Sequence, residues 1–409
     1  MNKKTKQTNS DKALSKIPIA VIFLAFIFLF GIATSGKVLY HAVTENQYAA
    51  SDLVDPAQTK AIISYIDDLY NEDIWQKNGF INYNGGFHRL AGHLVIRDAD
   101  PNNLIVKTAD NQLVTPLAKY DVTPKAENTN LLADYCAGKN IHFLYVQAPT
   151  KIIRNVTQLP TGITDYANTM MDEFAALLQE NDTGYLDLRT LSDKQTEPTT
   201  LFFRTDHHWQ TKTAFAAFQT ITQTIAQQYG IPIDQGKFDL NNYTVDHYDK
   251  CFLGSQGRRV GSLYDGLDDY DFIYPDFETN YTITYQTFKG TEVKTGDFMT
   301  TMVIQSHLNM SLPPSTNRYA SYFGEDYPAV IIQNNLVDTG KILLIKDSYS
   351  LPVAAFLSTT VHELCMLDPR YYTDMSIFDY INQYQPDLVI LMYSSSALSD
   401  LSVFQFDSK

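Results

Sequence analysis

Short apolar runs alternate with longer segments of helical periodicity along most of the chain. An uninterrupted run of four to six apolar residues, rich in Ile, Leu and Val, is typical of a strand buried on both faces. Such runs occur at Ile141–Val146, Ile342–Ile345, His362–Leu367 and Leu388–Tyr393, with a shorter one at Tyr185–Leu188. Apolar residues recur at helical spacing in Asn128–Gly138, Ala167–Gln179 and Thr211–Tyr229. This alternation predicts an α/β fold in which helices flank a parallel sheet.

Two stretches depart from this pattern. In Thr279–His307, Thr, Tyr and Val alternate with few helix formers, which predicts antiparallel hairpins inserted into the α/β core. Gly79–Pro116 predicts short strands and turns, with a turn at Asn84–Gly86 and strands near Leu94–Ile96 and Leu104–Val106.

The N-terminal region has the pattern of a membrane anchor. Ile17–Gly36 is a run without charged residues, and about 1.5 Å per residue gives it roughly the thickness of a bilayer core. Five lysines against one acid in Met1–Lys16 favour a cytoplasmic N-terminus. A cleaved signal peptide is the alternative, although the run exceeds the length of an h-region. We expect a cytoplasmic tail at 1–16, a transmembrane signal-anchor at 17–36, a stalk at 37–56 and a catalytic domain at 57–409. The last of these is expected to begin with a helix at Ala57–Leu69 and to carry the β insertion at 279–307.

Composition narrows the classes of partner. The 409 residues carry a formal net charge of −15, and removing the +4 of Met1–Lys16 leaves −19 for the rest. Such a surface is poorly suited to nucleic acid or anionic lipid, and it mildly favours a neutral over an acidic sugar polymer. The widely spaced Cys136, Cys251 and Cys365 indicate neither a zinc site nor a disulfide framework.

Ser348 is the first candidate for chemistry. It follows the apolar run that ends at Ile345 and precedes a segment that can be helical from about Leu351, with Ser350 as N-cap and Pro352 in the first turn. Open α/β sheets place reactive groups at such strand ends, where backbone N–H groups can face an oxyanion. A serine that merely caps the helix is the structural alternative.

The second candidate is the sequence Phe202–Gln210, FFRTDHHWQ. In an extended segment, side chains two apart point the same way, so Asp206 can orient His208 as a general base for a nucleophile. A hydrogen-bonded structural loop is one alternative. A metal site at Asp206, His207 and His208 is another, but the sequence supplies no obvious further ligand, so we expect no metal and no cofactor.

TDHHW and the later KDSYS together resemble the DHHW family, part of the SGNH-hydrolase-like proteins that include the alginate O-acetylation proteins. The similarity runs from about Asn71 to the end and includes the glycine-rich Phe252–Gly261, the acidic turn Asp265–Asp271 and Tyr322–Tyr327. The resemblance implies an SGNH-hydrolase-like fold with permuted motif order, the Asp–His pair preceding the serine.

By this resemblance, Ser348 is the nucleophile, His208 the base and Asp206 its orienter. Additional candidates for substrate binding or oxyanion support are Gln147, Tyr349, Arg204 and Trp209. For Trp209 we expect core anchoring before sugar stacking, and for Arg204 a surface ion pair is the alternative.

Together with the anchor expected from Ile17–Gly36, the resemblance implies a membrane-anchored, extracytoplasmic O-acetyltransferase that modifies a polysaccharide through an acyl-serine. An outside transferase needs an acyl group passed across the membrane, which implies a multi-pass membrane O-acyltransferase as partner. A carbohydrate acetyl esterase would use the same triad, and a non-catalytic glycan-binding or scaffold domain would keep the fold; the residues do not decide among these.

Overall fold

The computed structural model describes residues 17–45, 76–97, 104–193 and 198–407. The expected tail at 1–16, much of the expected stalk and the expected helix at Ala57–Leu69 lie outside these ranges. The chain divides into two units, Met1–Tyr83 and Asn84–Lys409.

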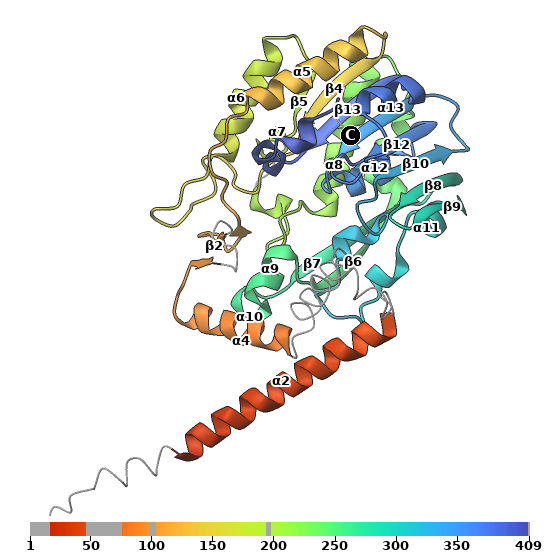
Figure 1. Cartoon of the computed structure of the whole chain (residues 1–409). Coiled ribbons are helices and arrows are strands. Elements are labelled where there is room, and N and C mark those ends of the chain that lie inside the picture. The colour runs from red at the N-terminus through yellow and green to blue at the C-terminus, as the bar shows by residue number, and fades with distance from the viewer. Residues whose placement is uncertain (1–16, 46–75, 98–103, 194–197, 408–409) are drawn as a thin grey trace, which may run out of the picture. The chain divides into compact units, whose positions relative to one another are not determined.

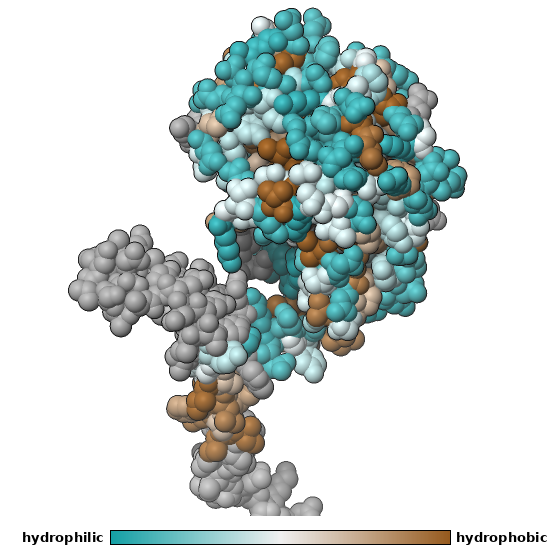
Figure 2. Space-filling model, turned by 90° about the vertical axis from the view of Figure 1, so that its right-hand side faces the viewer, coloured by the Kyte–Doolittle hydropathy of each residue, from teal (hydrophilic) through white to brown (hydrophobic). Residues whose placement is uncertain are grey.

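The first unit contains helix α2 (Ile17–Glu45), which exposes apolar side chains such as Ile22, Phe28 and Leu29 and is visible as a brown stretch in Figure 2. Among the helices of the described ranges, none meets the combined requirement of length and apolarity for a membrane span. The transmembrane segment expected at 17–36 therefore stays a prediction.

The second unit is built on a mixed sheet, which in the described residues has eight strands (Figure 1). In spatial order these are β5 (Tyr185–Asp187), β4 (His142–Gln147), β13 (Leu388–Tyr393), β11 (Lys341–Lys346), β12 (Glu363–Leu367), β10 (Ala329–Asn334), β8 (Tyr281–Thr287) and β9 (Gly290–Gly296). The first five are parallel, and the last three pair antiparallel. The predicted α/β fold with a flanked parallel sheet is thus confirmed, and its predicted strands lie within two residues of those observed.

Helices cover both faces of this sheet because its central strands are apolar on both sides. Along β11, Ile342 and Leu344 belong to one core cluster, whereas Leu343 and Ile345 belong to the other. The first cluster contains side chains of α8 (Thr211–Gln228) and α12 (Ser350–Leu357). The second contains side chains of α5 (Thr123–Ala137), α6 (Ala167–Gln179) and α13 (Ile377–Tyr384).

The turn expected at Asn84–Gly86 is wrong, because these residues lie inside helix α4 (Lys77–Leu90). A Cβ built on Gly85 would stand 1.9 Å from the carbonyl oxygen of Val260, at the end of helix α9 (Ser255–Val260). The glycine therefore permits close packing of helix against backbone, and it does not mark a turn.

The predicted antiparallel region is one hairpin, β8–β9, and it is part of the main sheet because β8 pairs with β10. The chain then forms the short helix α11 (Phe298–Thr301). A separate two-stranded ribbon, β6 (Tyr243–Phe252) and β7 (Asp268–Pro275), and a three-stranded sheet, β1 (Val95–Arg97), β2 (Leu104–Lys107) and β3 (Leu113–Val114), complete the strands described. Two short helices, α7 (Thr190–Asp193) and α10 (Ser262–Asp265), lie in the connections.

Candidate active site

Ser348 lies in the turn between strand β11 and helix α12. The strand is buried and parallel to both of its neighbours, as predicted. Ser350 is the first residue of the helix and not its N-cap; Tyr349 is the cap residue, and its side chain makes no capping hydrogen bond to the helix N-terminus. Pro352 lies in the first turn as expected. Ser348 is thus held at the carboxyl end of a central strand.

The segment that carries Asp206 and His208 is a tight loop and not an extended strand. Phe202 and Trp209 pair across its base in an antiparallel bridge. Within the loop, the backbone N–H of His208 donates to Asp206 Oδ1 over 2.9 Å. The two side chains therefore meet through a turn closed by the aspartate itself, not through strand alternation.

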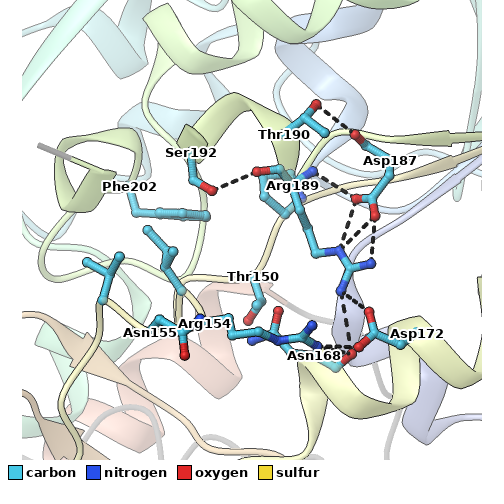
Figure 3. Close-up of a pocket in the computed structure, with 13 residues that line it drawn as sticks. Thr150, Arg154, Asn155, Asn168, Asp172, Asp187, Arg189, Thr190, Ser192 and Phe202 are labelled. Carbon is cyan, nitrogen blue, oxygen red and sulfur yellow. Dashed lines mark hydrogen bonds and ion pairs between the residues drawn. The ribbon is translucent and has the colours of Figure 1, made fainter. Parts of the chain in front are cut away.

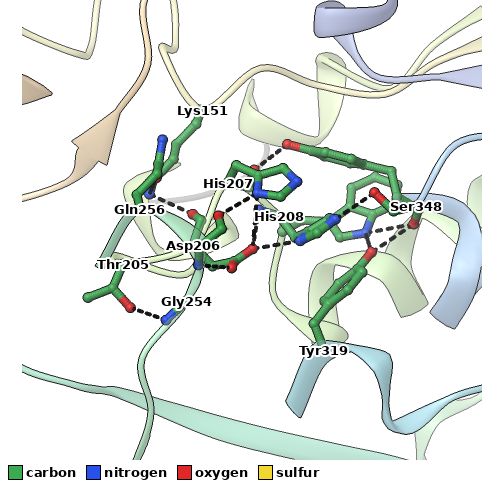
Figure 4. A network of polar contacts seen from close by, with 12 residues as sticks. Lys151, Thr205, Asp206, His207, His208, Gly254, Gln256, Tyr319 and Ser348 are labelled. Carbon is green, nitrogen blue, oxygen red and sulfur yellow. Dashed lines mark hydrogen bonds and ion pairs between the residues drawn. The ribbon is translucent and has the colours of Figure 1, made fainter. Parts of the chain in front are cut away.

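Asp206, His208 and Ser348 form one chain of hydrogen bonds (Figure 4). His208 Nδ1 lies 2.6 Å from Asp206 Oδ1, and its Nε2 lies 2.8 Å from Ser348 Oγ. Asp206 and His208 are both buried, whereas Ser348 is partly exposed. With the proton on Nδ1, the ring donates to the carboxylate and accepts from the serine hydroxyl, which is the geometry of a nucleophile with its base and orienter.

The glycine-rich segment holds the second oxygen of Asp206. The N–H of Ser255 donates to Asp206 Oδ2 over 2.6 Å. A Cβ on Gly254 would stand 2.2 Å from the Asp206 Cβ, so this close approach requires glycine. Burial alone would raise the pKa of Asp206, but the His208 and His207 rings and the hydrogen bonds hold that pKa well below its usual value.

The acidic turn holds the same loop from another side. Asp268 accepts hydrogen bonds from the backbone N–H groups of Arg204 and Thr205, both over 2.8 Å, and from the Thr205 hydroxyl over 2.5 Å. The Arg204 guanidinium pairs with Asp265 over 3.2 Å and donates to a backbone carbonyl. Arg204 therefore forms the ion pair named as the alternative, and these contacts point it to the acidic turn, not to Ser348.

Lys151 lies buried behind the loop, and sequence analysis did not identify it. Its ammonium donates to the carbonyl oxygens of Leu113, Arg204 and Asp206 and to Gln256 Oε1, over 2.6 to 3.1 Å. Burial lowers the pKa of Lys151 to about 7, against the opposing influence of nearby carboxylates. One side chain thus joins β3, the Asp–His loop and α9.

Aromatic side chains fix the imidazole of His208. The Tyr319 ring stacks on it with centroids 3.8 Å apart and an angle of 11° between the planes. Trp209 is fully buried, and its indole N–H lies 3.1 Å from both Tyr319 Oη and the carbonyl of Tyr349. Trp209 therefore anchors the core, as expected. The Tyr349 hydroxyl donates to the carbonyl of His207.

The turn offers fewer N–H groups for an oxyanion than the sequence suggested. The N–H of Tyr349 donates to the side chain of Asp347, and that of Ser350 to the Asp347 carbonyl. Within the described residues, the Ser348 N–H has no hydrogen-bond partner. Gln147 is fully buried, and its amide donates to the carbonyls of Ala148 and Tyr393, so it does not serve the site.

Asp206, His207 and His208 bring one ligand atom each to within 4.8 Å of one another, close enough to suit a metal. Hydrogen bonds already use these groups, since His207 Nδ1 lies 2.7 Å from Ser255 Oγ and the Asp206 and His208 atoms form the relay. A metal here would have to break the contact between His208 and its carboxylate. The arrangement fits a proton relay better than a metal centre.

Residues 108–249 match the family described as SGNH hydrolase-like domain, acetyltransferase AlgX. Among solved structures, PatB1 of Bacillus cereus with a sulfonyl adduct is 22% identical, with a TM-score of 0.61, covering 77% of this chain and 99% of that one. A DHHW family protein from Eubacterium siraeum is 17% identical, with a TM-score of 0.58 and coverages of 77% and 99%. No curated protein matches the sequence. These likenesses confirm the predicted resemblance and the SGNH hydrolase-like fold.

Proposed function

We propose that this SGNH hydrolase-like chain is an O-acetyltransferase that modifies a polysaccharide through an acyl group carried on Ser348. The observation that supports the proposal is the relay in which His208 contacts both Asp206, over 2.6 Å, and Ser348, over 2.8 Å. Loop and turn are 140 residues apart in sequence, so their meeting is a property of the fold. The matching family, described as an acetyltransferase, supports the choice of reaction.

In the first half-reaction, Ser348 Oγ attacks the carbonyl carbon of an acetyl ester while His208 Nε2 takes the hydroxyl proton. The tetrahedral intermediate collapses when the bond to the donor oxygen breaks, and His208 returns the proton to that leaving oxygen. Asp206 holds the ring and stabilises its charged form throughout. The Ser348 N–H, unpartnered in the described residues, supplies oxyanion support.

In the second half-reaction, a sugar hydroxyl takes the place of the departed donor. His208 accepts its proton as the oxygen attacks the acetyl-serine, and the proton then returns to Ser348 Oγ as the new ester leaves. Water in place of the sugar would give an esterase with the same residues. The two reactions therefore differ in the acceptor alone.

Mass spectrometry of the protein after exposure to an activated acetyl ester tests this proposal. We expect an added acetyl group on Ser348 that disappears in Ser348→Ala and His208→Ala, together with acetylated product when a soluble oligosaccharide is present. Absence of the adduct from wild-type protein that retains its fold would indicate a non-catalytic glycan-binding or scaffold domain. An adduct that yields acetate alone at every oligosaccharide concentration would indicate an esterase.

We also propose an extracytoplasmic, membrane-anchored location, with a multi-pass membrane O-acyltransferase as acyl donor. Its support is the charge-free run Ile17–Gly36 behind a lysine-rich flank. Fractionation of cells that express the full chain tests the location. Recovery in the membrane pellet after alkaline carbonate is expected, and it should be lost when residues 17–36 are deleted; release of the full chain into the supernatant would contradict the anchor.

A further inference from the structure

Four neighbouring parallel strands end at the same edge of the sheet, and each is followed by polar residues. In spatial order they are β11, followed by Ser348, then β13, followed by Ser394–Ser396, then β4, followed by Pro149–Lys151, and β5, followed by Arg189 and Thr190. Strands lie about 4.8 Å apart, so three spacings place the outer loops roughly 14 Å from the nucleophile. An extended polymer can lie along such an edge.

A cavity of about 340 Å³ lies at this edge, and its lining includes the sequence neighbours of His208 and Ser348 but not these two residues themselves. His207 and Tyr349, which adjoin the two halves of the relay, form part of its wall. The rest combines the hydroxyls of Ser394–Ser396 with apolar side chains such as Leu117 and Ile152. A wall of hydroxyls between apolar surfaces is suited to a sugar ring, which has polar edges and apolar faces.

Apart from Lys151, the charged side chains that line this near cavity are one carboxylate, Asp165, and one guanidinium, Arg259. Asp165 accepts the backbone N–H groups of Leu117 and Ala167, and Arg259 supplies one guanidinium. The Lys151 ammonium is enclosed by four oxygen acceptors. The cavity therefore fits an uncharged ligand.

A second cavity of about 300 Å³, drawn in Figure 3, is lined by residues that follow β4 and β5 at this edge. Thr150 lines both cavities, so they lie on either side of the loop that follows β4. In the far cavity Arg189 pairs with Asp187 over 2.6 Å and with Asp172 over 2.8 Å, and Arg154 also pairs with Asp172. The charges of the two guanidinium groups and the two carboxylates cancel. Their N–H donors and oxygen acceptors can form hydrogen bonds with sugar hydroxyls.

We propose that the two cavities form one acceptor groove for a neutral oligosaccharide, the near cavity holding the sugar to be acetylated and the far cavity a sugar further along the chain. The inference rests on the proposed function and specifies the acceptor that this site takes. An acidic polymer such as a polyuronate is disfavoured, because the protein carries a net charge of −15 and the groove has no unbalanced cation cluster.

Filling each cavity with an indole tests the groove. The variants are Ser396→Trp in the near cavity and Thr190→Trp in the far one, both at exposed positions. The matched control is Ala137→Trp, an exposed residue beside a cavity at the opposite, amino-terminal end of β4. Acetyl transfer to neutral oligosaccharides of increasing length and hydrolysis of the activated ester are measured side by side, with thermal melting to verify folding.

In Ser396→Trp, we expect transfer to fall at least tenfold more than hydrolysis. In Thr190→Trp, we expect KM to rise for long oligosaccharides and to stay within twofold for the shortest acceptor. Ala137→Trp should resemble wild type in both reactions. Equal transfer by all three variants, or faster transfer to an oligouronate than to a neutral chain of equal length, would overturn the groove while leaving the acetyl-serine in place.

Direct binding separates the groove from the chemistry. Ser348→Ala cannot form the acyl-enzyme, yet it should still bind a neutral oligosaccharide in calorimetry, because both cavities are unchanged. Adding Thr190→Trp to this variant should weaken binding at least fivefold, whereas adding Ala137→Trp should not. Binding that is insensitive to both substitutions would overturn the groove even if wild type acetylates sugars, and an absence of acetyl-serine in wild type would instead overturn the proposed function.

Discussion

Asp206 is a buried carboxylate whose oxygens accept the N–H groups of His208 and Ser255 and the imidazole of His208. These donors favour the ionised form, which is why its pKa lies well below the usual value in spite of burial. In an unfolded chain the same carboxyl would have a pKa of about 3.9. The carboxylate therefore contributes stability that is fully present above that pH and is lost as the pH falls through the folded-state pKa.

Asp206→Asn should show this dependence directly. The amide keeps the size of the side chain but has no charge, so we expect kcat for the activated ester to fall about 100-fold to 10,000-fold, because the imidazolium loses its stabilising partner. The difference in melting temperature between wild type and variant should be full at neutral pH and should narrow as the pH falls through the folded-state pKa of Asp206, which lies well below its usual value. Asp338→Asn, at an exposed position, is the control. If the difference in melting temperature between wild type and Asp206→Asn stays constant with pH, Asp206 is not an ionised carboxylate in the folded protein.

Gly254 provides a second test at the scale of one residue. A Cβ at this position would stand 2.2 Å from the Asp206 Cβ and 2.5 Å from Oδ2, so Gly254→Ala must displace the carboxylate. We expect the variant to lose about 1–3 kcal/mol of unfolding free energy, as overpacked sites do, and most of its ester turnover. Gly138→Ala, where the added Cβ meets atoms no nearer than 3.4 Å, should change neither quantity by a comparable amount.

At the scale of elements, the Asp–His loop is held by segments that lie far from it in sequence. Lys151 joins the loop to β3 and α9 through carbonyl oxygens, and Asp268 of β7 holds its entry. The Tyr319 ring stacks on His208 from a third segment. The loop is therefore positioned by tertiary contacts, although its own sequence provides the reactive groups.

Lys151→Met should loosen this assembly. The variant keeps the apolar stem but leaves buried carbonyl oxygens without a donor, so we expect about 3–5 kcal/mol lower stability in urea unfolding. Lys119→Met removes an exposed ion pair with Glu173 and should leave the urea midpoint unchanged. If the two variants unfold at the same urea concentration, Lys151 does not hold the loop.

The sequence predicted those parts of the fold that are encoded locally. The strand before Ser348 and helix α6 could be predicted because apolar periodicity is a property of neighbouring residues. The prediction of a turn at Asn84–Gly86 was wrong because Gly85 packs against the backbone of a residue about 175 positions away in sequence. The roles of Lys151 and Asp268 likewise depend on contacts between distant segments. No local pattern shows such contacts.

At the scale of the whole molecule, the relay and both cavities belong to the second unit, Asn84–Lys409. Its core clusters are formed by residues from 96 onward, so within the described residues this core contains no side chain of the first unit. A chain of residues 76–409 keeps helix α4 whole, including the buried Gly85 against Val260. Such a chain should therefore fold by itself.

We expect the 76–409 chain to melt within a few degrees of the full chain and to turn over the activated ester within twofold, because the relay needs no residue outside it. Chains that start at 92, after α4, provide the comparison: they lose Gly85 and its helix from the surface of α9, whose Ser255 N–H holds Asp206. Their turnover of the activated ester should fall well below that of the 76–409 chain, with only a small change in melting temperature. A 76–409 chain that is unfolded or inactive would show that the first unit contributes to the site.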